Sequence, residues 1–336
     1  MSGALRRVTD EQYLRVAHGT ALPIEQAPVW DAFDRLVAGR EPWRRYVYLD
    51  GDTPQAVVSL TQIAGPGPLS FLWAKNGPVW FTPPTAAEEA QLRAHLGRAV
   101  RRHAPRAAFV RLHAFHEADD LEPVLQGITW DRTVIVDLSP GEEEVFAGMK
   151  QQGRRAIRKA LRDESLTVTE ETAQTEESFA ELYAALQETG AREGFGPHPA
   201  RHYLNMLHSL GPEHARMFVT RREGRALAWA IVTVNDGHAL YSVGASNAEA
   251  RGAYAADLLQ WRIMQTLAGE GIDKYDLAGA GSDRFPGMHG LTQFKTKFER
   301  TITEIAPAWD FPVRPWVYRG IVAARNAKHY VRQARR

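Results

Sequence analysis

Residues 239–281, ALYSVGASNAEARGAYAADLLQWRIMQTLAGEGIDKYDLAGAG, carry the pattern that decides the fold. Ala239–Ala245 has the alternation of a strand, and Tyr254–Gly269 has the apolar spacing of a helix that ends at a glycine cap. Lys274–Ala278 is again a short strand. A strand, a loop, a helix and another strand in this order predict an α/β or α+β protein.

Further strands and helices are predicted on both sides of this stretch. Met217–Thr220 and Leu227–Val234 form one expected hairpin, and Trp43–Leu49 with Gln55–Ile63 form another around the turn sequence DGDT. The other expected elements are helices at Ala86–His103, Gly141–Glu164, Glu176–Glu193 and His198–Ser209 and strands at Ala107–His113 and Arg132–Leu138. Two consecutive halves of this kind predict two domains with mixed sheets.

Composition narrows the class of protein. The 336 residues are 44% hydrophobic and 24% charged, which is ordinary for a globular chain, and the net charge is +1. The chain has no cysteine, which excludes disulfides, thiolate metal sites and a cysteine nucleophile. His198 and His202 have the spacing of a zinc helix, but Pro199 replaces the expected glutamate, so no metal site is predicted. Charges interrupt the apolar runs of the N-terminus, which predicts a cytoplasmic protein.

Two segments are strongly basic. Lys150–Arg162 contains six cations and no carboxylate. One helical face collects four of them, Arg155, Arg158, Lys159 and Arg162. Such a face is suited to phosphates, including a tRNA backbone; the alternative is a solvated face paired with the acidic stretch Asp163–Glu181.

Arg314–Arg336 carries seven basic residues and no acid. It predicts contact with the inner face of the membrane or with RNA; the alternative is a helix docked on the first domain.

Two further positions follow predicted strands. After Ala239–Ala245, a short loop leads into a helix N-terminus, the geometry that binds the acyl-CoA pyrophosphate in acetyltransferases. That cradle needs small residues, yet Tyr254 stands where a glycine is expected. Lys295 lies close to the glycine-rich loop that follows Lys274–Ala278, and loops beyond strand ends are common places for functional sites.

Together these stretches resemble the FemABX family, the aminoacyltransferases that build peptidoglycan interpeptide bridges. The second domain of that family shows, in order, an RxxIRKA segment, an AxYLLQW-like helix, a YDLxG strand and a GLxxFKxxF segment. They correspond to Arg154–Ala160, Ala253–Trp261, Tyr275–Gly279 and Gly290–Phe298. Gly77-Pro78-Val79 after an aromatic strand also fits. No heptad run for the helical arm of longer members is present, so the chain resembles the short, arm-less FemX-like type.

The resemblance implies two acetyltransferase-like (GNAT-like) domains in tandem with a cleft between them. Residues 1–136 with 307–336 would form the first domain with a C-terminal helix, and residues 137–306 the second, which carries the transfer site. The implied reaction moves an amino acid from aminoacyl-tRNA to an amine of a peptidoglycan precursor, UDP-MurNAc-pentapeptide or lipid II. The donor ester is already activated, so the resemblance implies neither a cofactor nor a metal.

Matching the motifs residue by residue implies roles for individual side chains. Lys295 corresponds to the family's FK lysine and would stabilise the developing oxyanion, while Phe294 would shape the pocket. Tyr254 and Tyr203 match tyrosines that contact the acceptor, and Arg201 lies near the second of them. The tRNA phosphates or the acceptor diphosphate would be bound by Arg154, Arg155, Arg158 and Lys159.

The chain departs from the family at two positions that hold the acceptor. Pro199 stands where the family often has an arginine, and no lysine follows Gln26 and Trp30 in the expected pattern. The general base is left open among Asp257, Asp283 and His289. Two other functions also stay open: a GNAT-type acyl-CoA N-acyltransferase, and a non-catalytic tRNA- or lipid-binding protein that uses the basic helix and tail.

Overall fold

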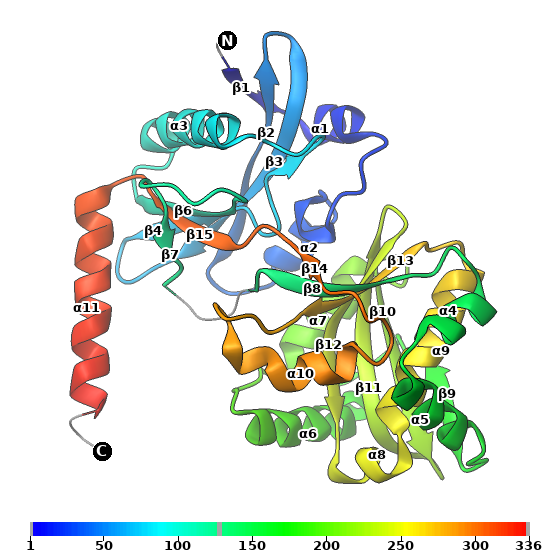
Figure 1. Ribbon diagram of the computed structural model, residues 1–336. Coiled ribbons are helices and arrows are strands. Elements are labelled where there is room, and N and C mark those ends of the chain that lie inside the picture. The colour runs from blue at the N-terminus through cyan, green and yellow to red at the C-terminus, as the bar shows by residue number, and fades with distance from the viewer. Residues whose placement is uncertain (1–2, 126–129, 334–336) are drawn as a thin grey trace. The chain divides into compact units, whose positions relative to one another are not determined.

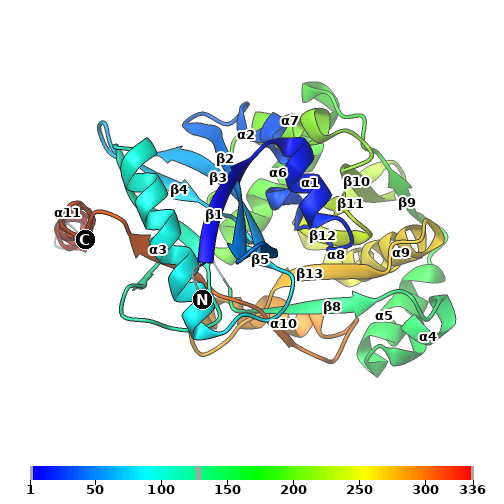
Figure 2. The ribbon, with the colours of Figure 1, turned by 90° about the horizontal axis from the view of Figure 1, so that it is seen from above.

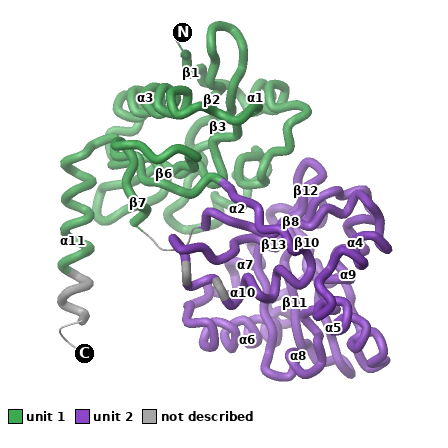
Figure 3. Tube along the Cα trace, in the orientation of Figure 1, with its two compact units in different colours: residues 1–129, 306–336 green, residues 130–305 purple. Residues whose placement is uncertain are grey.

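The structure, a computed structural model, describes residues 3–125 and 130–333, with the backbone alone at 286, 289 and 328–333. The chain forms two compact units, residues 1–129 with 306–336 and residues 130–305 (Figure 3). The segment 130–136, which the sequence analysis assigns to the first domain, lies in unit 2. The reason is that β8 (Arg132–Asp137) pairs with β13 (Lys274–Gly279) and β14 (Thr303–Glu304) in the second sheet.

Unit 1 is built on one mixed sheet. Its strands are β1 (Gly3–Val8), β2 (Arg40–Asp50), β3 (Thr53–Ala64), β4 (Ser70–Trp73), β5 (Val79–Trp80), β6 (Ala107–His113), β7 (Glu122–Pro123) and β15 (Ala308–Pro312). They lie in the order β1-β2-β3-β4-β6-β15-β7, and β5 pairs with β3. The predicted N-terminal hairpin is present as β2 and β3, and β4 runs parallel to β6. Because β15 comes from the end of the chain, this sheet forms only when both ends of the sequence meet.

The helices of unit 1 are α1 (Asp10–Ala17), the 3-10 helix η1 (Ile24–Gln26), α2 (Trp30–Asp34), α3 (Ala86–His103) and α11 (Pro315–Gln333). α3 has the predicted bounds, because Thr85 and Glu88 form a reciprocal capping box at its start. Leu96 and Val100 on α3 share a buried core with Val110 of the sheet. Burying a side chain of this size contributes about 1.5–3 kcal/mol.

Unit 2 is built on a second mixed sheet. Besides β8, β13 and β14, its strands are β9 (Leu166–Glu170), β10 (Ala215–Arg222), β11 (Arg225–Asn235) and β12 (His238–Ser246). The order is β14-β8-β13-β12-β11-β10-β9, and only β12 and β13 are parallel to one another among the pairs in this sheet of described residues. The mixed α/β fold predicted from the sequence is therefore confirmed.

The helices of unit 2 are α4 (Glu142–Gly148), α5 (Gln151–Leu161), α6 (Glu176–Glu193), α7 (Ala200–Leu210), α8 (Ala248–Ala253), α9 (Ala255–Gly269), the 3-10 helix η2 (Pro286–Met288) and α10 (His289–Lys295). They cover both faces of the sheet (Figures 1 and 2). The indole N–H of Trp229 on β11 donates to the Leu182 carbonyl of α6, whereas the neighbouring Ala230 shares a core with Leu258 of α9. Successive strand residues point to opposite faces, so α6 and α9 lie on opposite sides. Within the described residues, no helix combines the length and hydropathy that a bilayer crossing needs.

Three helices differ from the sequence-based prediction. The helix expected over His198–Ser209 runs from Ala200 to Leu210, with Pro199 as its N-cap. The helix expected over Gly141–Glu164 is interrupted at Met149 and Lys150, whose ψ angles of 155° and 148° are extended. The backbone N–H of Lys150 donates to the Lys297 carbonyl instead of continuing the helix. The helix expected from Tyr254 begins one residue later, because Tyr254 is left-handed with φ 56° and separates α8 from α9.

Candidate functional site

The parallel strands β12 and β13 separate before they end. Their pairing stops at Leu240 opposite Asp276, although both strands continue beyond that pair. β13 stays with β8 through an irregular step between Asp276 and Gly279. α8 and α9 follow β12, and η2 and α10 follow β13. Tyr254, between α8 and α9, and Lys295, at the end of α10, therefore each come after one of the two strands that separate.

Lys295, the last residue of α10, is buried with 4% of its surface exposed. Its Nζ donates a hydrogen bond of 2.6 Å to the Gly279 carbonyl. Burial lowers the pKa of Lys295 to about 8, and the nearby Asp276 carboxylate acts in the opposite direction. Among the described residues, the Gly279 carbonyl is the one hydrogen-bond acceptor of this Nζ. A positioned ammonium of this kind can stabilise an oxyanion or transfer a proton.

A carboxylate shapes the backbone around the Gly279 carbonyl. Asp276 accepts hydrogen bonds from the Thr133 hydroxyl and, at 2.7 Å, from the Ala278 N–H. Ala278 has a left-handed φ of 62°, which a residue with a Cβ adopts only under local constraint. A Cβ on Gly279 would lie 2.7 Å from the Trp130 ring, so this position requires glycine. The sequence analysis assigns Asp276 no role, although it stands in the YDLxG motif.

The first turn of α9 carries a carboxylate in place of an anion-binding cradle. Asp257 is 5% exposed and pairs with the Lys297 ammonium at 2.7 Å. Burial raises the pKa of Asp257, and Lys297 acts against that rise. Tyr254 precedes this turn, with the Lys159 Nζ 4.9 Å from the centre of its ring. The Tyr254 ring stands where an acyl-CoA cradle has a small residue, and the carboxylate of the first turn is already paired with a lysine.

Phe294 lies half-buried beside the same ion pair. Its ring packs edge-on against Phe298, with 5.3 Å between ring centres, and the Lys297 Nζ lies 5.1 Å from the Phe294 centre. Lys150 at the start of α5 donates to the Thr296 hydroxyl at 2.9 Å. α5, α9 and α10 therefore converge here. Of the predicted site residues, the structure places Lys159 against Tyr254, while Phe294 contacts Lys297, the partner of Asp257. Lys295 follows Phe294 in the chain, and its own hydrogen bond goes to Gly279.

The basic face of α5 is open to solvent. Arg155, Arg158 and Lys159 are exposed. Arg154 differs from them, because its guanidinium donates to backbone carbonyls at the end of α4, including that of Ala147 at 2.8 Å. Arg154 therefore caps α4, and the exposed cations Arg155, Arg158 and Lys159, with the exposed Arg162 at the C-cap of α5, form the part of the face that a phosphate can reach.

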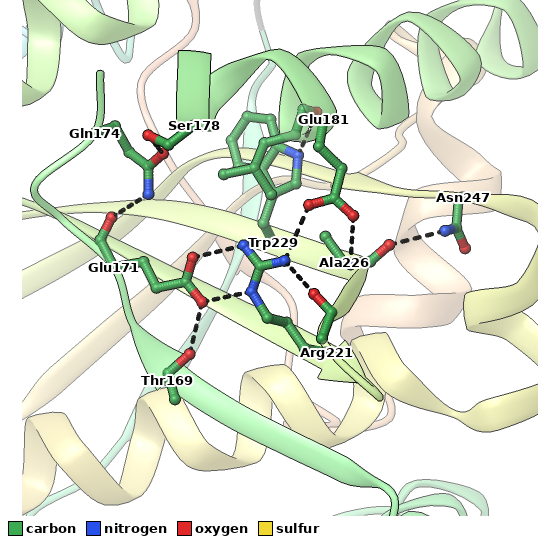
Figure 4. Close-up of polar contacts among 11 residues, drawn as sticks. Thr169, Glu171, Gln174, Ser178, Glu181, Arg221, Ala226, Trp229 and Asn247 are labelled. Carbon is green, nitrogen blue, oxygen red and sulfur yellow. Dashed lines mark hydrogen bonds and ion pairs between the residues drawn. The ribbon is translucent and has the colours of Figure 1, made fainter. Parts of the chain in front are cut away.

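The acidic stretch Asp163–Glu181 pairs with β10 and not with α5. Arg221 donates to both carboxylate oxygens of Glu171, at 2.7 and 2.8 Å, and to Glu181 at 2.9 Å (Figure 4). The neighbouring arginines of β10 bind acids of the same stretch, Arg216 to Glu170 and Arg222 to Asp163. In the part of the chain that the structure describes, no carboxylate pairs with the exposed cations of α5, so the pairing that this alternative expects is absent and the face is solvated.

Tyr203 and Arg201 lie on α7, which packs with α6 on the side of the sheet away from α9. Tyr203 is 5% exposed, its hydroxyl accepts a hydrogen bond of 3.0 Å from the His198 N–H, and its ring centre lies 6.2 Å from that of Phe179. Arg201 is exposed. Within unit 2, the structure does not bring these residues to Lys295.

In unit 1, Gln26 and Trp30 have a lysine beside them that sequence spacing does not reveal. The Lys75 Nζ lies 4.9 Å from the centre of the Trp30 ring and 2.7 Å from the buried Glu25 carboxylate. The Gln26 side chain donates to the Lys75 carbonyl at 2.8 Å. Lys75 follows β4, far along the chain from Trp30, so only the fold places the two together.

The three candidates for the general base lie in different surroundings. Asp257 is bound to Lys297, and Asp283 is exposed. The side chain of His289 lies outside the described residues. A cavity of about 270 Å³ in unit 2 lies between α4 and α9 and is not lined by any of these candidates. Among the described residues, no group of three His, Asp or Glu side chains is placed to hold a metal ion.

These features define a class of protein, the tandem acetyltransferase-like (GNAT) fold. Each unit has a mixed sheet with a pair of parallel strands, joined through α3 in one and α9 in the other. Residues 147–295 match a family model described as an acetyltransferase (GNAT) domain. Comparison with curated proteins finds no match.

Among solved structures, the chain is similar to FemX, with a TM-score of 0.73 and 16% identity over 94% of this chain and 99% of that chain. It is also similar to a tandem GNAT protein from the clavulanic acid biosynthesis pathway, with a TM-score of 0.52 and 12% identity over 92% and 97% of the two chains. L-PGS from Bacillus licheniformis gives a TM-score of 0.51 and 13% identity over 95% of each chain. Identities this low establish the fold alone. They confirm the tandem GNAT fold and, at that level, the resemblance to the FemABX family; the cleft expected between the domains stays a prediction.

Proposed function

We propose that this protein is an aminoacyltransferase that moves an amino acid from aminoacyl-tRNA to an amine of a peptidoglycan precursor stem peptide. The fold shared with FemX supports the proposal, as do the FemABX-like motifs, which fall on α5, α9, β13 and α10. The acceptor is UDP-MurNAc-pentapeptide or lipid II. Because charged tRNA is a cytoplasmic donor, the proposal places the reaction in the cytoplasm.

The observation that carries the proposal is the buried Lys295 ammonium held on the Gly279 carbonyl. An acceptor amine attacks the ester carbonyl, a C–N bond forms and the C–O bond to the ribose breaks, and the proton lost by the amine ends on the ribose oxygen. Negative charge develops on the carbonyl oxygen and then on the leaving oxygen. A preorganised ammonium in a dry site stabilises that charge, and losing such a donor costs ~10²–10³-fold in rate.

The exposed cations of α5 supply the phosphate contacts that this reaction needs. Arg155, Arg158 and Lys159 face solvent, and Lys159 also lies over the Tyr254 ring at the start of α9. Phosphates of the tRNA or of the acceptor diphosphate would therefore be held next to the element that leads to Phe294 and Lys295.

The test offers the purified protein a pool of charged tRNAs, together with UDP-MurNAc-pentapeptide in one reaction and lipid II in another. Mass spectrometry of the products identifies the transferred amino acid and the attacked amine. We expect a stem peptide that is heavier by one amino-acid residue, formed only when the tRNA is charged. Absence of any such product with both acceptors would contradict the proposal.

The match of residues 147–295 to an acetyltransferase domain favours a second candidate, an acyl-CoA N-acyltransferase. Tyr254 at the start of α9 argues against it, because its side chain stands where a pyrophosphate cradle needs a small residue. Titration with coenzyme A separates the two. A saturable rise in melting temperature would support the second candidate, and an unchanged melting temperature is expected for the first.

A further inference from the structure

The separation of β12 and β13 opens the middle of the second sheet. β12 lies between β11 and β13, yet its residues from Leu240 to Gly244 are all partly exposed, whereas Ala226–Thr233 of the adjacent β11 are buried. The exposed stretch begins where the pairing of β12 with β13 ends, at Leu240 opposite Asp276. Solvent therefore reaches this part of a central strand because its neighbour on one side has moved away.

A β-bulge turns Tyr241 and Gly244 to the same side of β12. Tyr241 and Val243 are opposite neighbouring residues of β11, so Ser242 between them has no partner on that strand. The extra residue places Tyr241 and Gly244 on one face, which packs against the core shared with α9. A Cβ on Gly244 would overlap the Tyr241 hydroxyl. The ring therefore lies along the strand, and its hydroxyl is over the Gly244 backbone.

This hydroxyl has no partner within the protein. Among the residues that the structure describes, none forms a hydrogen bond with it, and burial alone raises the pKa of Tyr241 to about 12. The nearby Tyr275 of β13 differs, because it is fully buried and its hydroxyl donates to the Gln260 side chain of α9 at 2.9 Å. Polar groups in protein interiors normally have such a partner. Tyr241 therefore presents a neutral hydrogen-bond donor that the fold itself does not use.

The Tyr241 hydroxyl and the Lys295 ammonium lie at nearly the same level of the strand divergence. Gly244, under the hydroxyl, is three residues beyond the last pair of β12 with β13 when counted along β11. Gly279, whose carbonyl holds Lys295, is two residues beyond that pair when counted along β8. The two levels differ by one residue, or about 3.4 Å along the strands. Each of the two separated strands thus carries one hydrogen-bond donor at this level.

We propose that Tyr241 is a catalytic residue of the transfer reaction, whose hydroxyl donates a hydrogen bond to the carbonyl oxygen of the aminoacyl ester, beside Lys295. This inference rests on the proposed function. The acceptor amine adds to the carbonyl carbon, and the carbonyl oxygen carries negative charge until the C–O bond to the ribose breaks. A phenol hydroxyl stabilises that charge without giving up its proton, because a hydrogen bond strengthens as its acceptor becomes anionic.

The test compares the single-turnover transfer rates of Tyr241→Phe and Tyr275→Phe with that of the unaltered protein. Tyr241→Phe keeps the ring and removes only an unpartnered hydroxyl, so the melting temperature should not fall. Its rate should fall ~10²–10³-fold, with an unchanged half-saturating concentration of charged tRNA, because the lost bond strengthens in the transition state. Tyr275→Phe loses the bond to Gln260, so its melting temperature should fall while its rate stays close to that of the unaltered protein.

Gly244→Ala is a second, independent variant. The backbone of Gly244 is not left-handed, so alanine is compatible with it, but the new Cβ displaces the Tyr241 hydroxyl. The rate should fall as for Tyr241→Phe, and the double variant should be no slower than the slower single variant, because both changes remove the same contact. Gly252→Ala is the control, since its new Cβ meets no atom within 4 Å.

The proposal is overturned if Tyr241→Phe and Gly244→Ala transfer as fast as the unaltered protein. It is also overturned if the two effects multiply in the double variant, or if Tyr241→Phe lowers the melting temperature as much as Tyr275→Phe does. Failure of the proposed function has a different signature, because the unaltered protein then forms no aminoacylated product.

Discussion

At the scale of single residues, burial determines the pH at which Lys295 is charged. Burial lowers the pKa of its ammonium to about 8, so the cation that stabilises the oxyanion is present below that pH and lost above it. The ratio of the transfer rates of the unaltered protein and of Lys295→Met should therefore be constant below pH 8 and fall above it. Single-turnover rates measured across this range give the ratio, in which the pH dependence of the substrates cancels. A ratio that stays constant through pH 8 would exclude a catalytic ammonium.

Asp276 acts on Lys295 through charge as well as through the backbone. Its carboxylate raises the pKa of Lys295 against the effect of burial. Asp276→Asn removes that charge, so the alkaline limb of the rate profile should move to lower pH. Asp273→Asn, which removes an exposed carboxylate just before β13, should leave the limb in place. A lower rate without a displaced limb would mean that Asp276 only supports the fold.

The sequence identifies Lys295 as a candidate site residue but not Asp276, because a motif marks the lysine whereas only tertiary contacts reveal the role of the aspartate. Lys295 stands in a recognisable motif, whereas the role of Asp276 depends on its hydrogen bonds to Thr133 and Ala278. Thr133 lies on β8, far away in the sequence. A long-range pair of strands brings them together, and no local pattern encodes that pairing.

At the scale of elements, the arginines of β10 bind acids at the end of the neighbouring strand β9, in the segment after it and on α6. Arg221 has 21% of its side chain exposed and bridges Glu171 and Glu181. Arg221→Ala should lower the free energy of unfolding by about 1–3 kcal/mol, because it removes both bonds to the partly buried Glu171 carboxylate and leaves it only the Thr169 hydroxyl. Arg225→Ala, in the same hairpin but 63% exposed, should lower it by less than about 1 kcal/mol. Equal losses in urea unfolding would contradict this assignment.

Substitutions in the basic helix α5 should affect either tRNA binding or the stability of the fold, depending on which arginine is replaced. Arg155→Ser with Arg158→Ser should weaken tRNA binding and reduce the slope of log K against log salt by roughly one to two, since each lost phosphate contact removes about one unit. Arg154→Ser should instead lower the melting temperature, because it uncaps α4. Filter binding over a salt series, with Arg98→Ser as the control, measures the first effect. An unchanged slope would remove α5 from the binding surface.

Local patterns predict most elements and miss those that tertiary contacts impose. The capping box at Thr85 fixes the start of α3, so the prediction matches the structure. The break between α4 and α5 has no proline, and it exists because the Lys150 N–H bonds to Lys297 far along the chain. Similarly, the apolar run of β8 predicts a strand but not the sheet that it joins.

At the scale of the whole molecule, the order of strands and helices along the sequence indicates a duplicated α/β plan. The ordered motifs point to the second domain, and the FemX-like fold confirms the tandem arrangement. The boundary at residue 130 could not be derived from composition, because it depends on which sheet β8 enters. The proximity of Lys75 to Gln26 and Trp30 cannot be predicted from the sequence either, since Lys75 follows β4 and only the fold places it beside them.

The central claim is tested most directly by the single-turnover rate of aminoacyl transfer for Lys295→Met beside Lys274→Met. Methionine keeps the length and packing of the buried side chain, and Lys274 is an exposed lysine of β13 in the same unit. The account predicts a ~10²–10³-fold slower rate for Lys295→Met, with tRNA binding retained and no change for Lys274→Met. A folded Lys295→Met protein that transfers as fast as Lys274→Met would contradict it.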